Sequence, residues 1–165
     1  EGFDLIQTDI APRFADTNPN VSFIVGGTRV PKFEEANIRS LGFIADIQNI
    51  SGADIAIVPL RSGGGTRLKI FDYMSAGLPI VTTKKGIEGI DAENYEHAII
   101  VDDIDEDFIA GIRYLIEHKD ERKRIGENAR ALAEAKYDWR IIGGKLEDVY
   151  RTLVPESSIH YNNSA

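Results

Sequence analysis

Three consecutive glycines followed by two cations stand near the middle of the chain. The glycine segment, Gly63–Gly65, is separated by one threonine from Arg67 and Lys69. If a helix begins there, its first turn has unpaired N–H groups and carries the positive end of the helix dipole, so it attracts anions. Glycines let a phosphate approach the backbone, and the two cations can add charge-assisted hydrogen bonds. These residue types and their order therefore predict a phosphate-binding site.

A carboxylate, Asp72, follows six positions after Thr66 and would lie beside the first two turns of this helix. A carboxylate repels phosphate, but it can accept hydrogen bonds from the hydroxyls of an attached sugar. Cations for phosphates and an acid for hydroxyls suit a nucleotide sugar. A Walker loop would need Gly-Lys-Ser/Thr after four intervening residues, and the dinucleotide fingerprint would need a glycine where Leu68 stands. Neither phosphate-binding motif therefore fits this segment. On spacing alone a second interpretation stays open, in which a glycine-rich turn precedes solvated cations and a surface ion pair.

Short apolar segments alternate with helical patterns along the chain. We expect strands at 21–25, 38–44, 53–59, 79–83 and 97–101, and helices at about 6–18, 66–76, 108–116, 125–133 and 139–153. Residues 26–37 show little order. This alternation is typical of an α/β, Rossmann-like doubly wound parallel sheet covered by helices. Such sheets bind ligands at the carboxyl ends of their strands, and the glycine segment directly follows the third expected strand.

The ends of the helical patterns give further expectations. Gly77 is expected to end the helix that follows the glycine segment, and Asp120 to cap a later one. The acids Asp102, Asp103 and 105–107 are expected in a solvated loop and a helix cap. Trp139 lies on the most regular apolar stripe and is expected in the core. Because the chain opens on a helix, we expect its sheet to lack a first strand; the alternative is that this helix packs as an extra element. Residues 1–154 are read as one domain and 155–165 as a polar tail.

Composition limits the functional classes. A length of 165 residues suits a single domain, and the formal net charge of −8 argues against nucleic acid as the main partner. The chain has no cysteine, and its three scattered histidines make no metal site. There is no apolar run of membrane-spanning length and no signal peptide, so a cytoplasmic location is expected.

The segment "PLRSGGGTRLKIFDYMSAGLPIVTTKKGIEGI" resembles the signature of the group 1 (family 4) glycosyltransferases, which have the GT-B fold. The resemblance continues in "FIVGG", "LGFIADI", "ADIAIVPL" and "IGENARALAEAKYDWRIIGGKLEDVY". It implies two Rossmann-like domains facing across a cleft, of which this chain is similar to the carboxy-terminal, nucleotide-sugar-binding one. The implied partner is an amino-terminal acceptor-binding domain of the same protein, through which the enzyme could associate with the inner face of a membrane. The family also implies retention of configuration, no cofactor and no bound metal.

The family often has two glutamates eight positions apart, one contacting the donor sugar and the other the ribose. They fall on Gly64, which has no side chain, and on Asp72. The backbone N–H groups at and after Gly64 are therefore the expected sugar contacts. The resemblance implies Arg67 and Lys69 as catalytic residues, and Gly63, Gly64, Gly65, Thr66 and Asp72 as donor-binding residues. Glu88 is added to the donor-binding residues because it lies in the loop after the fourth expected strand and so faces the ligand edge.

The expected function is donor binding in a retaining glycosyltransferase that serves surface polysaccharide or glycolipid synthesis, with the nucleotide, sugar and acceptor left open. A non-catalytic nucleotide- or phosphate-binding module of the same fold is the alternative, consistent with the bare Gly64. A sugar-nucleotide epimerase would need further acids and histidines that are not found.

Overall fold

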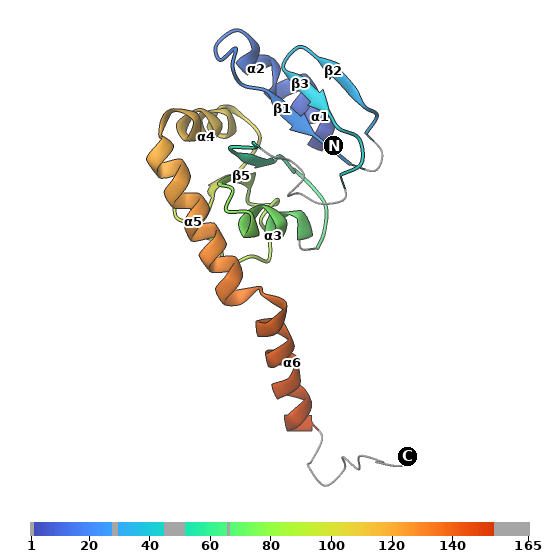
Figure 1. The fold of residues 1–165 in the computed structure, drawn as a ribbon, viewed down its shortest axis with the longest axis vertical. Coiled ribbons are helices and arrows are strands. Elements are labelled where there is room, and N and C mark those ends of the chain that lie inside the picture. The colour runs from blue at the N-terminus through green and yellow to red at the C-terminus, as the bar shows by residue number, and fades with distance from the viewer. Residues whose placement is uncertain (1, 28–29, 45–51, 66, 154–165) are drawn as a thin grey trace.

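The computed structural model describes residues 2–27, 30–44, 52–65 and 67–153 (Figure 1). The expected first helix is present as three joined pieces: α1 (Gly2–Leu5), the π-helical η1 (Ile6–Ile10) and α2 (Pro12–Ala15). The Ala11 N–H donates to the Ile6 carbonyl at 2.9 Å, five residues back, which widens the middle turn. The pieces share one buried face, so the helical interpretation of this segment is confirmed.

The first sheet is three-stranded, in the order β1-β3-β2. Its strands are β1 (Phe23–Val25), β2 (Phe33–Glu35) and β3 (Ile38–Ser40). β1 and β3 are parallel, as expected, whereas β2 runs antiparallel to β3. The expectation of little order over 26–37 was therefore wrong, because β2 forms a tight hairpin with β3 through Ala36, whose φ is +49°.

The second sheet is parallel throughout, in the order β4-β5-β6. It contains β4 (Ala56–Val58), β5 (Ile80–Thr83) and β6 (Ile99–Val101), each within an expected strand. In the described part of the chain, β1 and β4 each pair with a single strand. A further strand preceding Glu1 stays a prediction.

Four longer helices complete the fold: α3 (Leu68–Ser75), α4 (Glu106–Glu117), α5 (Lys119–Lys136) and α6 (Trp139–Leu153). The end of α3 at Gly77 is confirmed: its φ is +69°, and its N–H donates to the Met74 carbonyl at 2.9 Å. Asp105 caps α4 by accepting a bond from the Asp107 N–H at 3.0 Å. Asp120 lies inside the first turn of α5 instead of capping it, since the N-cap position is His118, two residues before the predicted cap.

Helix α5 packs closely on α3. A Cβ atom on Gly126, in the middle of α5, would lie 2.2 Å from the carbonyl oxygen of Gly77. The two backbones therefore meet without a side chain between them, and this contact fixes α3 against the second sheet. Around it lies an apolar cluster that includes Val58, Ile70, Met74, Ile80 and Leu132.

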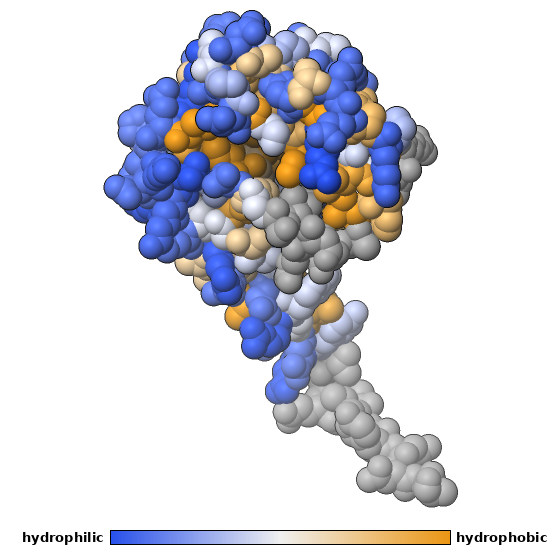
Figure 2. Space-filling view, turned by 45° about the horizontal axis from the view of Figure 1, so that its top comes forward, coloured by the Kyte–Doolittle hydropathy of each residue, from blue (hydrophilic) through white to orange (hydrophobic). Residues whose placement is uncertain are grey.

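Helix α6 extends away from the rest of the molecule (Figure 1), and in the space-filling view it leaves the rounded body as a narrow arm (Figure 2). No residue of α6 is buried, and the Trp139 side chain is 82% exposed. The expectation of Trp139 in the core was therefore wrong. An apolar stripe predicts which face of a helix is apolar, but it does not say whether a surface in the same chain covers that face.

The tail expected at 155–165 lies outside the described residues, and the domain boundary at 154 stays a prediction. Within the described residues, no helix is both long enough and apolar enough to cross a membrane.

Candidate functional site

The glycine segment lies where the sequence places it, between the carboxyl end of β4 and the first turn of α3 (Figure 1). Gly63 and Gly65 have φ values of +115° and +80°, a region that residues with a side chain rarely adopt. The φ of Gly64 lies outside this region, and a Cβ atom there would meet nothing within 4 Å. Two of the three glycines are thus explained by the turn itself. Thr66 lies outside the described residues.

Arg67 lies across the glycine segment. Its Nη1 donates to the Gly64 carbonyl at 3.0 Å and its Nη2 to the Ser62 carbonyl at 3.4 Å. A Cβ atom on Gly63 would be 2.3 Å from Nη2, so the guanidinium occupies the space that a side chain would fill. The Arg67 Nε is buried and has no hydrogen-bond partner in the described part of the chain. The structure therefore brings the arginine and the glycines together, with the cation against backbone carbonyls.

Lys69 and Asp72 are exposed on the first two turns of α3. Glu88 comes from the segment after β5, and its carboxylate pairs with Lys85 at 2.6 Å. This hydrogen bond and the lysine charge lower the pKa of Glu88 below its usual range, and the charge of Arg67 adds to the effect. The Glu88 segment follows the carboxyl end of β5 and the glycine segment follows that of β4; because these two strands are parallel neighbours, both segments lie at the same edge of the sheet.

Ion pairs that the sequence interpretation missed lie at the same edge. Arg61, three residues after β4, pairs with Asp103 after β6 at 3.0 Å, and Lys84, next to the end of β5, pairs with Asp102 at 2.5 Å. The pKa of Asp103 is lowered, mainly by the N–H of Ile104 and then by Arg61. The two aspartates had been interpreted as a solvated loop. The sequence did contain a signal for these ion pairs, because basic and acidic residues directly follow strands that are neighbours in a parallel sheet.

The start of α1 also approaches this edge. A Cβ atom on Gly2 would lie 3.5 Å from the Pro59 carbonyl oxygen and 3.9 Å from Leu60 Cδ2. The first helical segment therefore begins beside the carboxyl end of β4, close to where the glycine segment starts. The sequence contained no signal for this contact.

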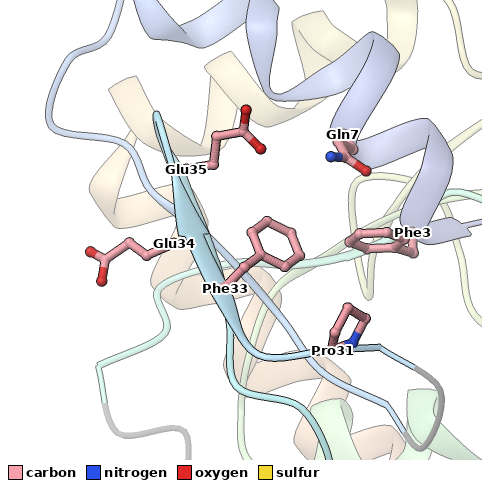
Figure 3. A pocket seen from close by; sticks show the side chains of 6 residues that line it. All are labelled: Phe3, Gln7, Pro31, Phe33, Glu34 and Glu35. Atoms are coloured by element: carbon pink, nitrogen blue, oxygen red, sulfur yellow. The ribbon is translucent and has the colours of Figure 1, made fainter.

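A shallow hollow of about 420 Å³ lies elsewhere, between α1 and β2 (Figure 3). The rings of Phe3 and Phe33 meet there edge to face, with centroids 5.9 Å apart. Its lining residues are Phe3, Gln7, Pro31, Phe33, Glu34 and Glu35. None of them belongs to the predicted site. In the described ranges, no cluster of acidic or histidine side chains could hold a metal ion.

Parallel strands, helices packed on them and a glycine segment at the carboxyl end of a strand define an α/β domain of the Rossmann-like class. Residues 1–118 match the family model described as "Glycosyl transferases group 1". The chain belongs to this family, and the resemblance seen in the sequence is confirmed.

Two curated proteins are similar over part of the chain. An uncharacterized glycosyltransferase of Methanocaldococcus jannaschii is 26% identical over 106 residues, which are 64% of this chain and 27% of that protein. Spore coat protein SA of Bacillus subtilis is 28% identical over 82 residues, 48% of this chain and 22% of that protein. The matched part is thus about a quarter of the length of these relatives.

Solved glycosyltransferase structures share the fold. HepE of Anabaena, determined in complex with UDP-glucose, matches with a TM-score of 0.73 and 21% identity over 87% of this chain and 44% of that one. The C-terminal domain of LpcC, a group 1 glycosyl transferase of Francisella tularensis, matches with a TM-score of 0.56 and 23% identity over 64% of this chain and 56% of that one. The α/β architecture of the chain therefore matches GT-B glycosyltransferases.

Proposed function

We propose that the chain is the donor-binding domain of a retaining glycosyltransferase, which moves a sugar from a nucleotide diphosphate sugar to a glycan or lipid-linked acceptor. The observation that carries the proposal is the position of the glycine segment, between the carboxyl end of β4 and the first turn of α3, with Arg67 across it. Membership of the family supports it, and HepE was determined with UDP-glucose.

In this proposal the diphosphate binds over the glycine segment. The N–H groups of the first turn of α3 and the side chains of Arg67 and Lys69 donate to it. Arg67 now donates to the neutral carbonyls of Ser62 and Gly64. A phosphate oxygen is the stronger acceptor for a guanidinium because the hydrogen bond then joins opposite charges. An arriving diphosphate can therefore take over these hydrogen bonds.

The sugar and ribose contacts come from the flanking residues. The backbone at Gly64, Gly65 and Thr66 donates to the donor sugar, because Gly64 has no carboxylate to offer. Asp72 accepts from the ribose hydroxyls. Glu88 is held ionised by Lys85, so it can act only as an acceptor for donor hydroxyls.

The proposed chemistry is electrostatic. As the sugar becomes cation-like, negative charge builds up on the departing diphosphate, and fixed cations and helix N–H groups stabilise it without a metal or cofactor. The acceptor attacks the face from which the diphosphate leaves, so no enzyme nucleophile is needed. The acceptor is held by an amino-terminal domain of the same protein, in the cytoplasm or at the inner face of the membrane.

The proposal is tested by titration calorimetry of this chain with UDP, GDP and ADP. We expect one nucleotide to bind in preference to the others, and the Asp72→Asn variant to bind it more weakly with unchanged circular dichroism. If none of the three binds at millimolar concentration, the donor role is wrong.

One observation favours a second candidate, a nucleotide-binding module without catalysis: the family's sugar-contacting carboxylate is replaced by Gly64. The two candidates differ in turnover. In the whole protein, slow hydrolysis of the preferred nucleotide sugar without acceptor supports the transferase, whereas binding with no turnover under any acceptor condition supports the module.

The glycine segment offers a matched pair of substitutions. Gly63→Ala would place a methyl group 2.3 Å from the Arg67 guanidinium and force a side chain to adopt a φ of +115°, whereas the Cβ of Gly64→Ala meets nothing within 4 Å. We expect Gly63→Ala to weaken binding of the preferred nucleotide roughly tenfold in calorimetry, and Gly64→Ala to change it little. Equal affinities for the two variants would contradict the placement of Arg67.

A further inference from the structure

Strand β5 ends in two buried threonines. The side chains of Thr82 and Thr83 are 0% and 1% exposed, at the carboxyl end of the central strand of the second sheet. The Thr83 hydroxyl donates to the Leu60 carbonyl at 2.5 Å and accepts from the Gly86 N–H at 3.0 Å. Both partners are backbone groups outside the regular strands, so this single hydroxyl holds two loops.

The two loops are the ones that carry the candidate site. The β4–β5 pairing ends at Val58 opposite Thr82, so Leu60 lies beyond the last ladder bond and leads into the glycine segment. Gly86 lies in the segment that carries Glu88. Beyond the end of the β4–β5 pairing, the Thr83 side chain therefore makes the hydrogen bond to the β4 segment that backbone groups make within the sheet. Without it, the buried part of both loops would lose a hydrogen bond that water does not readily replace.

Close packing shows that this linkage is tight. A Cβ atom on Gly86 would lie 2.2 Å from the Thr82 hydroxyl oxygen and 3.0 Å from the Val58 carbonyl oxygen. The Ile87 N–H also donates to the Thr83 carbonyl at 3.2 Å. The segment after β5 is thus pressed against the end of β4, and it turns around Thr83.

We propose that Thr83 is a positioning residue of the donor site, which fixes the spacing between the glycine segment and the Glu88 segment. The inference rests on the proposed function for what the two segments bind. Thr83 itself is buried and touches no ligand; it acts by keeping two sets of donor contacts at a fixed separation. No part of the family resemblance assigned a role to it.

The test compares three variants of this chain. Thr83→Val keeps the shape and removes the hydroxyl, and Thr83→Ser keeps the hydroxyl. Thr82→Val is the matched control, because valine keeps the shape that packs on Gly86. The equally buried hydroxyl that it removes donates only within the strands, to the Val58 carbonyl at 3.2 Å or the Thr83 carbonyl at 3.3 Å. We expect Thr83→Val to bind the preferred nucleotide (UDP, GDP or ADP) roughly tenfold more weakly than Thr82→Val, and Thr83→Ser to bind like the unchanged chain.

Hydrogen exchange without ligand gives the second readout. Thr83→Val should speed exchange of the amides at 60–65 and 86–88 more than Thr82→Val does, at equal stability in urea. If Thr83→Val matches Thr82→Val in both exchange and affinity, the positioning role is overturned. If the unchanged chain binds no nucleotide, the proposed function fails and the donor-site role fails with it, whereas faster exchange would still show that Thr83 links the loops.

Discussion

Replacing Arg67 and Lys69 together by alanine is expected to weaken nucleoside diphosphate binding by roughly two orders of magnitude. Arg67 lies across the glycine segment and Lys69 is exposed on the next turn of α3, so both can reach an anion at the start of this helix. The variant loses two cations and, with Arg67, the guanidinium bonds to Ser62 and Gly64. Titration calorimetry with the preferred nucleotide measures the change.

A charge-matched control comes from α5. Lys123 and Arg130 each pair with a glutamate one turn further along, Glu127 and Glu134, on exposed positions. Replacing both by alanine changes the net charge by the same amount as the test variant and should leave nucleotide affinity unchanged. The difference in nucleotide affinity between the two variants should become smaller as the salt concentration is raised, because salt screens exposed charges. Equal losses of affinity in both would show that only net charge matters, and would remove the site-specific role of Arg67 and Lys69.

Gly126→Ala is expected to destabilise the domain by about 3 kcal/mol or more. The added methyl group would lie 2.2 Å from the carbonyl oxygen of Gly77 and 3.3 Å from Pro79 Cδ. Neither neighbour can rotate away, since one is backbone and the other a ring. Helix α5 must therefore shift from α3, which opens the apolar cluster around Met74 and Ile80. Urea unfolding followed by circular dichroism measures the free energy of unfolding.

The control is the same substitution in α6. Gly143 also lies inside a helix, but a Cβ atom there meets nothing within 4 Å. Gly143→Ala should leave the domain unaffected and stabilise the helix by up to about 1 kcal/mol, because alanine has the higher helix propensity. A similar small effect for both variants would mean that α5 and α3 are not in backbone contact.

Features set by local chemistry could be predicted from the sequence. Gly77 ends α3 because a residue with φ of +69° is needed there. The segment 79–83 contains β5 because its β-branched residues suit a strand, and all four residues of β5 are buried. Asp105 caps α4 through its own side chain. In each case the cause lies within a few residues of the effect.

Features that depend on a distant partner could not be predicted. β2 reads Phe-Glu-Glu, without an apolar alternation, and it is a strand only because β3 offers an edge for pairing. Trp139 lies on a regular stripe, yet the described chain presents no surface to cover it. The helical spacing of apolar residues shows that a helix has an apolar face, but it does not show which surface, if any, covers that face.

The features of the candidate site also fall into those set by local sequence and those that depend on distant contacts. Spacing and residue type placed the glycine segment, Arg67 and Glu88 at one edge of the sheet. The direction of the Arg67 guanidinium, towards carbonyls 3.0 and 3.4 Å away, depends on the path of the loop in three dimensions. So does the hydroxyl of Thr83, which in the sequence is one more β-branched residue of an apolar strand.

The exposure of Trp139 has a practical consequence for spectroscopy. It is the one tryptophan of the chain, and its side chain is 82% exposed on α6. Indole emission therefore reports the water around that helix, and it should start at the long wavelength of a solvated ring even in the native protein. Unfolding of the core will hardly change the emission wavelength of Trp139. A shift of this emission to shorter wavelength will mean that another surface has covered this part of α6.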